Sequence, residues 1–417
     1  MIPIGLDDVA RLCPGKLERA PTAIRVTGVE IDSRRIARGD LFVAVGAGGA
    51  FVRDALAAGA SAALVPDDAF AALAALGAEV RGRSHARVVA ITGSTGKTST
   101  KDILAAICAP HARTVAAEAS FNNELGVPLT LCRIAEDTDV CIVELAMRGL
   151  GQIAELASLA RPEIGVVTNV GAAHLELVGS VAEVARAKGE LVEALPAGGV
   201  AIVPAAFPIT RDDLEVVRID EPDARIEGGR TIVRFGDREI AFSFRARHQA
   251  QNALVALLVA RALGIDADDE VEVDFSRWRG EEVELAVGGL LINDCYNANP
   301  ASMSAALTHL ADCSEGRRMV AVLGEMAELG ASSPDFHREV GRQASELGID
   351  VLVAVGPLAR HYLETASEVP DRAWIATAGE AAGAALSAVR PGDCVLVKAS
   401  RAVGLEAVAD ALSAGRI

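Results

Sequence analysis

One short segment constrains the fold of this chain more than any other: a glycine-containing turn between an apolar run and a helical pattern. Residues 88–91 are apolar and mostly β-branched, Gly93 and Gly96 follow, and Lys97 and Thr98 open the helical pattern. Glycines let backbone N–H groups close around phosphate oxygens, and a helix N-terminus adds partial positive charge. The spacing therefore predicts a phosphate-binding loop, in which Lys97 reaches the terminal phosphates and the Thr98 hydroxyl faces Mg²⁺.

This loop departs from the strict motif at one position. The strict pattern has a glycine five residues before Gly96, and this chain has Ile91 there, so its form is Thr-Gly-x-x-Gly-Lys-Thr. The alternative interpretation is an ordinary glycine-rich turn in front of a helix. The coincidence of strand, Gly-Lys-Thr and helix favours the phosphate-binding loop.

Length and composition favour a multidomain protein built from helices and parallel sheets. The 417 residues predict two or three domains. Hydrophobic residues make up 51% and aromatic residues 3%, so the cores are expected to contain mostly Ala, Val, Leu and Ile. The formal net charge of −17 argues against nucleic acid or an anionic membrane as the main partner, although an anionic small molecule needs only a local positive site.

The cysteines and the first residues favour a cytoplasmic protein. The seven cysteines are scattered and form no Cys-x-x-Cys pair, so we expect reduced thiols. The first residues include Asp7 and Asp8 and show no basic stretch followed by an apolar run, so no secretory signal is expected. No run of about 18 uncharged apolar residues is present, so no membrane span is expected.

The order of apolar runs predicts three α/β units. Residues 1–84 are expected to form a small α/β domain that ends in a helix over 69–78 and a linker at 81–84. Residues 85–284 alternate strands and helices after the phosphate loop, which predicts a parallel sheet. Residues 285–417 predict a Rossmann-like doubly wound sheet without Gly-x-Gly-x-x-Gly, so a dinucleotide cofactor is not expected.

Three ionisable side chains fall at or after strand ends of the central unit. Glu144 ends one apolar run, His174 follows the next strand, and Lys188 is on the helical pattern after it. Parallel strands bring their carboxyl ends to the edge that also carries the phosphate loop, so these groups could hold Mg²⁺ beside phosphates. Taken singly, each also fits a structural role, as an N-cap or solvated glutamate, a hydrogen-bonded histidine and a solvated lysine.

A second group of polar side chains falls near the third unit. Residues 293–300 end a strand and begin a helix; Asp294 could accept hydrogen bonds from ribose hydroxyls, and Asn297 and Asn299 could position a base or phosphates. The alternative is an Asx-turn followed by a helix N-cap. Arg279 could neutralise a γ-phosphate, and a solvated surface arginine is the alternative for it.

Taken together and in order, segments of all three units resemble the Mur ligase family. Asp-Ser-Arg at 32–34 and Gly-Asp-Leu-Phe-Val-Ala at 39–44 resemble its uridine-nucleotide domain, and 91–98 resembles its ATP loop. The more specific segments are Phe-Asn-Asn-Glu-Leu-Gly-Val-Pro, Asp-Cys-Tyr-Asn-Ala-Asn-Pro, Leu-Gly-Glu-Met-Ala-Glu-Leu-Gly and Val-Lys-Ala-Ser-Arg, at 121–128, 294–300, 323–330 and 397–401. These segments are typical of the member that adds a dipeptide rather than a single amino acid.

The resemblance implies an α/β fold of three domains: a small UDP-substrate domain, a P-loop parallel-sheet ATPase domain and a Rossmann-like C-terminal acceptor domain. It also implies ATP-dependent joining of D-alanyl-D-alanine to a UDP-muramoyl tripeptide through an acyl phosphate, the last cytoplasmic step toward the peptidoglycan pentapeptide precursor. ATP and Mg²⁺ are the expected cofactors. The expected partners are these small-molecule substrates, without nucleic acid, and the chain is expected to be a monomer.

Residue by residue, the resemblance assigns roles to positions of this chain. The expected catalytic residues are Lys97, Lys188, His174 and Arg279, with Lys188 carried as a carbamate. The expected metal ligands are Thr98, Glu144, His174 and Lys188. ATP is expected to contact Thr92, Gly93, Ser94, Thr95, Gly96, Lys97, Thr98, Ser99, Asn252, Arg279, Asp294, Asn297 and Asn299. The substrates are expected to contact Ser33, Arg34, Asn122, Asn123, Glu124, Glu325, Lys398 and Arg401.

One segment of the amino-terminal unit departs from the family pattern. Between residues 45 and 55 the family usually carries a longer loop with Asp-Gly-His near the UDP-sugar, and this chain has Gly-Ala-Gly-Gly-Ala-Phe at 46–51. Either the glycines supply backbone donors in its place, or the donor substrate differs. A further alternative is a nucleotide-switched ATPase or regulatory protein without ligase activity, and the presence of Glu144, His174 and Lys188 weighs against it.

Overall fold

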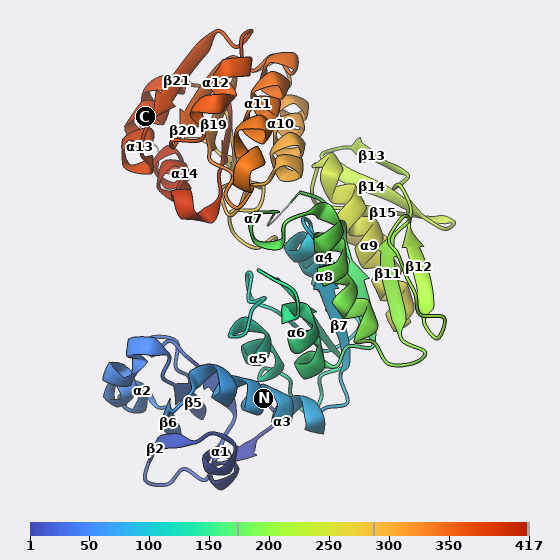
Figure 1. The fold of residues 1–417 in the computed structure, drawn as a ribbon, viewed down its shortest axis with the longest axis vertical. Coiled ribbons are helices and arrows are strands. Elements are labelled where there is room, and N and C mark those ends of the chain that lie inside the picture. Colours follow the sequence, from blue (N-terminus) through green and yellow to red (C-terminus); the bar gives the residue numbers. More distant parts are fainter. Residues whose placement is uncertain (173–174, 287, 415–417) are drawn as a thin grey trace.

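Three α/β units follow one another along the molecule (Figure 1). A computed structural model of the chain describes residues 1–172, 175–286 and 288–414. The amino-terminal unit lies at one end, the carboxy-terminal unit lies at the other, and the unit with the phosphate loop lies between them. This arrangement agrees with the α/β, three-domain fold expected from the sequence.

The amino-terminal unit contains a mixed four-stranded sheet of order β2-β6-β5-β4 and the antiparallel pair β1-β3. The expectation of a linker at 81–84 is wrong, because α3 continues to Arg83. Arg81 in its last turn donates hydrogen bonds to the carbonyl oxygens of Ala160 and Arg161, at 2.9 and 3.0 Å, which holds the helix against the central unit. The elements are β1 (Ile4–Gly5), α1 (Leu6–Leu12), β2 (Gly15–Arg19), β3 (Arg25–Val26), β4 (Gly28–Glu30), β5 (Asp40–Val43), η1 (Gly46–Phe51), α2 (Val52–Ala58), β6 (Ala62–Pro66) and α3 (Ala69–Arg83).

The central unit is a parallel six-stranded sheet of order β12-β11-β10-β7-β9-β8. The phosphate loop follows β7, an interior strand. The elements are β7 (Arg87–Thr92), α4 (Lys97–Cys108), β8 (Thr114–Ala116), α5 (Gly126–Leu131), β9 (Val140–Glu144), α6 (Gln152–Ala160), β10 (Ile164–Val167), α7 (Leu175–Val178), α8 (Val181–Glu193), β11 (Val200–Pro204) and β12 (Glu215–Ile219). A four-stranded sheet of β13 (Ala224–Glu227), β14 (Arg230–Phe235), β15 (Arg238–Phe242) and β16 (Glu270–Val271) accompanies α9 (Arg247–Leu263).

The carboxy-terminal unit is a six-stranded sheet of order β17-β18-β22-β19-β20-β21, in which β17 alone is antiparallel to its neighbour. The elements are β17 (Glu281–Glu284), β18 (Leu290–Asp294), α10 (Pro300–Ser314), β19 (Met319–Gly324), η2 (Gly330–Ser332), α11 (Ser333–Glu346), β20 (Val351–Val355), α12 (Arg360–Thr365), β21 (Asp371–Ile375), α13 (Ala378–Ala388), β22 (Cys394–Lys398), η3 (Arg401–Val403) and α14 (Glu406–Ser413). Among the described residues, no helix has the length and apolar character needed to cross a bilayer.

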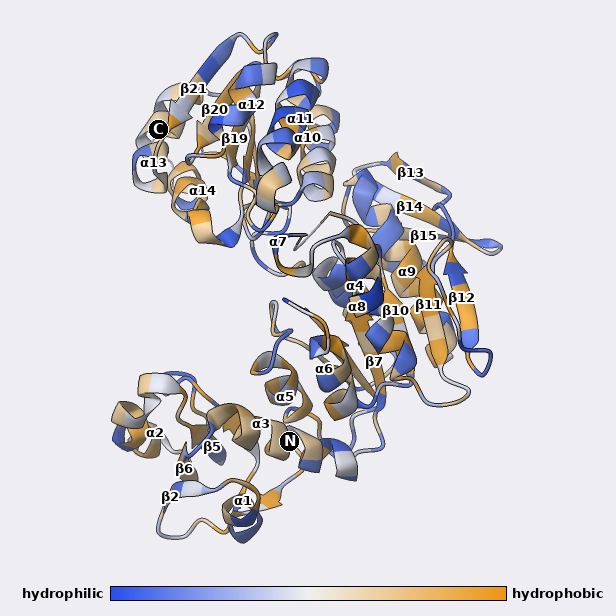
Figure 2. Cartoon of the chain, viewed as in Figure 1, coloured by the Kyte–Doolittle hydropathy of each residue, from blue (hydrophilic) through white to orange (hydrophobic). Residues whose placement is uncertain are grey.

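Both faces of the central sheet are covered, which explains its nearly uniform apolar strands (Figure 2). Along β7, Val88 and Ala90 pack into a core that continues into the amino-terminal unit, whereas Val89 and Ile91 pack into the core that contains α4 and α9. This alternation is the two-residue period of a strand. The phosphate loop therefore extends from a strand that is fixed on both sides.

Candidate functional site

The phosphate loop has the backbone geometry that its glycines predict. Gly93 has φ +152° and Gly96 has φ +77°. A Cβ atom at these positions would lie 1.9 Å from Thr168 Oγ1 and 2.3 Å from Asn252 Oδ1, so both positions require glycine. As the N-cap of α4, Gly96 supplies no side-chain cap, which leaves the N–H groups of the first turn available to an anion.

Lys97 begins α4 and turns back into the loop. Its Nζ donates a hydrogen bond to Gly93 O at 2.8 Å. Burial lowers the pKa of Lys97, the Glu144 carboxylate partly opposes this shift, and the charge of Arg279 adds to it. A partly buried cation at the wall of a cavity interacts more strongly with an entering anion than it would in bulk water.

The end of the neighbouring strand β10 ties the loop in place. Asn169 Nδ2 donates to Thr95 Oγ1 at 2.6 Å, and Thr95 N donates to Asn169 Oδ1 at 2.9 Å. Thr168 Oγ1 donates to Thr95 O at 2.6 Å. Neither Thr168 nor Asn169 was predicted to have a role in the site. The available signal was their position at the carboxyl end of a strand predicted to lie in the same sheet.

Glu144 ends β9 beside the loop, and its carboxylate is 1% exposed. Thr98 Oγ1 donates to Glu144 Oε2 at 2.7 Å, and Asn122 Nδ2 donates to Glu144 Oε1 at 2.8 Å. These contacts bring together two of the four predicted metal ligands, and both present oxygen, which Mg²⁺ prefers. The segment 121–128 thus reaches the phosphate loop through Asn122.

Lys188 lies on α8 and is 2% exposed. Burial, followed by the charge of Lys97, lowers the pKa of Lys188 well below its ordinary value. His174, the remaining predicted metal ligand, lies outside the described residues.

Asn252 approaches the loop from α9. Its Nδ2 donates to Gln249 Oε1 at 2.7 Å, and its Oδ1 lies 3.4 Å from the donor Thr100 Oγ1. Gln249 Nε2 in turn lies 3.4 Å from Ser99 Oγ. Asn252, a predicted nucleotide contact, thus lies beside the phosphate loop, and Gln249, which was not predicted, lies there with it.

The carboxyl edge of the C-terminal sheet supplies the opposite wall. Lys398 Nζ contacts Asp294 Oδ2 at 2.6 Å and donates to Asn297 O at 3.0 Å. Asn299 caps α10, since its Oδ1 accepts from Ser302 N at 2.9 Å. Asn299 therefore acts as a helix N-cap, which was the alternative to nucleotide contact. It also lines the cavity between the central and C-terminal units.

Two arginines of this wall lie on aromatic rings. The Arg279 guanidinium lies 4.1 Å from the centroid of the Tyr296 ring, and that of Arg401 lies 4.5 Å from the centroid of Trp278. Arg401 also forms an ion pair with Glu406 at 3.1 Å. Arg279 is therefore held by a ring rather than solvated freely.

These two walls enclose one cavity of about 660 Å³ between the central and C-terminal units. Its lining combines most of the predicted site residues with others that were not predicted, among them Arg148, His248, Gln249 and Tyr296. The predicted residues that line it are Ser94, Thr95, Gly96, Lys97, Thr98, Ser99, Asn122, Asn123, Glu124, Glu144, Asn252, Arg279, Asp294, Asn297, Asn299, Lys398 and Arg401.

Several predicted residues lie elsewhere. Thr92 and Gly93 do not line the cavity, whose lining begins at Ser94, and Lys188 is buried on α8. Glu325 Oε1 instead accepts a hydrogen bond from Leu358 N at 2.5 Å. Ser33 and Arg34 belong to the amino-terminal unit, where the Arg34 guanidinium contacts Asp32 Oδ2 at 2.6 Å.

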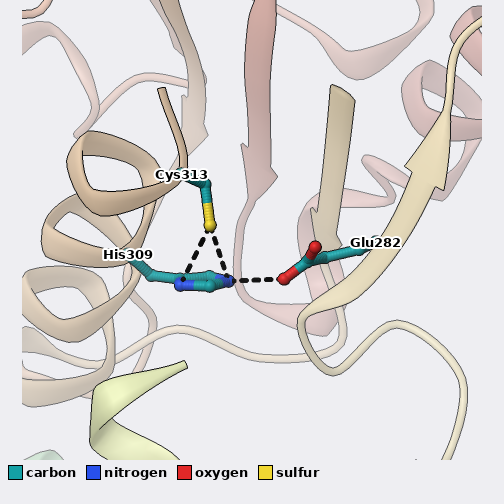
Figure 3. A group of neighbouring side chains, drawn as sticks. All are labelled: Glu282, His309 and Cys313. Atoms are coloured by element: carbon teal, nitrogen blue, oxygen red, sulfur yellow. Dashed lines mark hydrogen bonds and ion pairs between the residues drawn. The ribbon is translucent and has the colours of Figure 1, made fainter. Parts of the chain in front are cut away.

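A separate group of titratable side chains, here the Glu282 cluster, consists of Glu282, His309 and Cys313 (Figure 3). Glu282 Oε1 lies 3.1 Å from His309 Nε2, and Cys313 Sγ lies 3.5 Å from His309 Nδ1. Arg245 occupies the position of a counter-ion, with Nη2 2.8 Å from Glu282 Oε2. Burial is the main reason that the pKa of Cys313 is raised to about 12, so its thiol is protonated.

The fold and the site define a class of protein: one with a phosphate loop that lines a cavity between a parallel-sheet unit and a Rossmann-like unit. Residues 91–260 match the Mur ligase middle domain, and residues 278–401 match the Mur ligase glutamate ligase domain. The chain belongs to the Mur ligase family, as its sequence motifs predict.

Relatives match over nearly the full length. The UDP-N-acetylmuramoyl-tripeptide–D-alanyl-D-alanine ligase of Mycobacterium tuberculosis is 38% identical over 94% of this chain and 93% of its own. That of Escherichia coli is 34% identical over 99% of both. Among solved structures, MurF from Acinetobacter baumannii has a TM-score of 0.82 at 28% identity and covers 99% of both chains. MurF from Thermotoga maritima in complex with ADP has a TM-score of 0.78 at 26% identity, over 93% of this chain and 97% of its own.

Proposed function

We propose that this chain joins D-alanyl-D-alanine to UDP-N-acetylmuramoyl-tripeptide, with ATP converted to ADP and phosphate. The observation that carries the proposal is the shared cavity, which the phosphate loop lines on one side and the Asp294–Lys398 pair lines on the other. Membership of the Mur ligase family makes the chain an ATP-dependent ligase, and the relatives named for this reaction match it from end to end.

The chemistry needs two steps in this cavity. A carboxylate oxygen of the tripeptide attacks the γ-phosphorus, an O–P bond forms, and the bond to the bridging oxygen breaks to release ADP. The amine of the dipeptide then attacks the carbonyl carbon, phosphate leaves, and the nitrogen loses a proton. The first step brings together two anions, the carboxylate and the γ-phosphate. Lys97 and Arg279, which are held in place by Gly93 and Tyr296, are proposed to offset the repulsion between these anions.

Mg²⁺ is the proposed metal, and the oxygen donors around Glu144 fit it. Thr98 and Glu144 are the described residues proposed to hold it, together with Lys188 as a carbamate and His174, as the resemblance implies. When bound, Mg²⁺ would withdraw charge from the phosphate oxygens. The lowered pKa of Lys188 favours the neutral amine, the form whose nitrogen can bond to the carbon of CO₂ with release of one proton to give a carbamate.

The three units are proposed to divide the substrates. Residues 1–84 would take the uridine nucleotide with Ser33 and Arg34, residues 85–284 would take ATP, and residues 285–417 would take the acceptor. Asn122, Asn123 and Glu124 are proposed to contact the donor, and Lys398 and Arg401 the acceptor, with Glu325 acting only if its bond to Leu358 N is exchanged. A cytoplasmic location and a monomeric state remain predictions.

One observation favours a second candidate, the same ligase chemistry on a different donor. The short loop 46–51 forms the 3₁₀ helix η1, and its last residue, Phe51, is 49% exposed. The family's longer loop near the UDP-sugar has no counterpart of equal length there. Calorimetry with UDP-muramoyl tripeptide separates the candidates, because tight binding would reject a changed donor.

The test of the proposed function is a complete ligase assay. Purified protein is incubated with ATP, Mg²⁺, UDP-muramoyl tripeptide and D-alanyl-D-alanine, and both phosphate and pentapeptide product are measured. We expect phosphate and pentapeptide in equal amounts. No pentapeptide should form in a control reaction without the dipeptide. Phosphate without pentapeptide would favour an ATPase or regulatory protein, and an inactive protein beside an active control ligase would reject the proposal.

A further inference from the structure

Two neighbouring residues of α4, Lys101 and Asp102, form a buried ion pair outside the cavity. Their side chains are 3% and 8% exposed, and Lys101 Nζ lies 2.7 Å from Asp102 Oδ1. Lys101 Nζ also donates to Ala117 O at 2.7 Å. Neither residue lines the cavity, so neither is placed to touch ATP or the reacting groups.

Asp102 connects α4 to the segment that enters the C-terminal unit. Asp102 Oδ2 accepts from Ser276 N at 2.9 Å, and Oδ1 accepts from Ser276 Oγ at 3.2 Å. Arg279 follows three residues later and reaches the cavity. Asp102 therefore fixes the start of the short segment that carries Arg279 toward the phosphate loop.

Lys101 connects the same helix to a second segment of the cavity wall. Ala117 begins the stretch that leads to Asn122, which holds the Glu144 carboxylate. Both segments then meet at Tyr296: Ser120 Oγ contacts the Tyr296 hydroxyl, and Tyr296 N donates to Trp278 O at 3.1 Å. Tyr296, whose ring supports Arg279, is thus held by the segment after Ala117 at its hydroxyl and by the segment after Ser276 at its backbone N–H.

A buried ion pair is weak evidence for stability, because desolvation of the two charges offsets their attraction. Its hydrogen bonds are directional, however, and here they fix two loops relative to the helix that begins at the phosphate loop. We propose that Lys101 and Asp102 are positioning residues, which hold Arg279 and the Tyr296 ring at the geometry needed for phosphoryl transfer. This inference rests on the proposed function.

The first test is Asp102→Asn in the full chain. An amide offers one acceptor oxygen where the carboxylate serves Lys101 and Ser276 together, so at least one buried donor loses its partner. Because small misplacements remote from the chemistry are costly, we expect kcat to fall by roughly tenfold to a hundredfold. The Kd for a non-hydrolysable ATP analogue should change by less than about threefold, since the phosphate loop is untouched. Asp268→Asn is the matched control, because Asp268 pairs with His111 near the other end of α4 and is 56% exposed.

The second test asks whether Asp102 acts through Arg279. Arg279→Lys alone is compared with Arg279→Lys combined with Asp102→Asn. If Asp102 serves mainly to place Arg279, the combined loss in kcat should be close to that of Arg279→Lys alone. Independent, multiplicative losses would overturn the proposal, as would a folded Asp102→Asn variant with normal kcat.

A third variant separates positioning from stability. Lys101→Met with Asp102→Leu keeps an apolar pair of similar volume in place of the ions, which often preserves stability. Its Tm should fall only modestly, because Ser276 N and Oγ lose their acceptors, and kcat measured well below that Tm should still be lowered. Normal kcat in this variant would reject the positioning role, and failure of both variants to fold would show that the pair is only structural. If the wild-type protein itself forms no pentapeptide, the proposed function fails rather than this inference.

Discussion

The cavity at the phosphate loop and the Glu282 cluster both gather titratable side chains, but they balance their charges differently. In the cavity, the ammonium of Lys97 meets a carbonyl oxygen, and the carboxylate of Glu144 meets a hydroxyl and an amide. In the Glu282 cluster, the guanidinium of Arg245 already lies 2.8 Å from the carboxylate.

This difference shows what makes a group of close side chains a binding site. Short distances occur in both places, whereas open volume beside incompletely compensated charge occurs at the phosphate loop. An anion entering the loop meets the partly buried Lys97, whose attraction for it is stronger than in bulk water. A cation entering the Glu282 cluster would have to displace Arg245 and a thiol proton.

The largest effect is expected for Lys97→Ala. Losing one preorganised cation opposite the transferred phosphate should lower kcat by roughly a hundredfold or more. Steady-state phosphate release with all three substrates measures this. Lys16→Ala is the control, because Lys16 lies in the amino-terminal unit, pairs with Glu18 and is 74% exposed. A near-normal kcat for Lys97→Ala would contradict the role of the loop.

Lys188→Ala should lower activity somewhat less than Lys97→Ala does, and part of the lost activity should be restorable. If Lys188 carries a carbamate that orients a metal, its loss should lower activity by roughly tenfold or more. Short carboxylic acids, which can enter the vacated space, should restore part of the activity. The same acids added to Lys97→Ala should restore nothing, because that variant lacks a cation. Equal responses of the two variants would count against the carbamate.

The sequence predicted the parts of the site that depend on local spacing. Gly93, Gly96 and Lys97 lie within a few residues of each other, and their strand-turn-helix context is local, so the phosphate loop was predictable. The α/β units were predictable because strands such as β7 are apolar on both faces.

Contacts between distant segments were not predictable in the same way. The continuation of α3 to Arg83 depends on carbonyl oxygens of residues 160 and 161, far along the chain. Asn169 binds the phosphate loop through Thr95, and Arg245 pairs with Glu282. No pattern of neighbouring residues in the sequence indicates either pairing. Hydrophobic patterns define elements, whereas such hydrogen bonds appear only when the tertiary structure is known.

His248 connects the two regions and is the basis for a prediction about how stability depends on pH. It lines the cavity, and its ring centroid lies 5.9 Å from that of His309 in the Glu282 cluster. Burial, with a contribution from His309, lowers the pKa of His248 to about 4. Between pH 6.5 and 4 the unfolded state therefore binds more protons, so this contribution to stability is lost as pH falls. We expect a loss of roughly 3 kcal/mol by pH 4. Urea unfolding should show a flatter pH profile for His248→Gln, and identical profiles would contradict the assignment.

The smallest effects concern zinc at the Glu282 cluster. In the wild-type protein, Zn²⁺ should leave Tm unchanged, because Arg245 holds the carboxylate and burial keeps the Cys313 thiol protonated. Arg245→Gln removes the competing cation, so Zn²⁺ should raise the Tm of this variant by a few degrees, consistent with about 1 kcal/mol of linked binding.

The matched control for this prediction is Arg247→Gln. Arg247 begins α9 and forms its ion pair with Asp312 at 3.2 Å, so its loss leaves Glu282 paired with Arg245. A zinc response in Arg245→Gln but not in Arg247→Gln would show that the guanidinium decides whether the cluster binds a cation. A zinc response already present in the wild-type protein would instead show that Arg245 does not compensate Glu282, and the contrast with the phosphate-loop cavity would then rest on volume rather than charge.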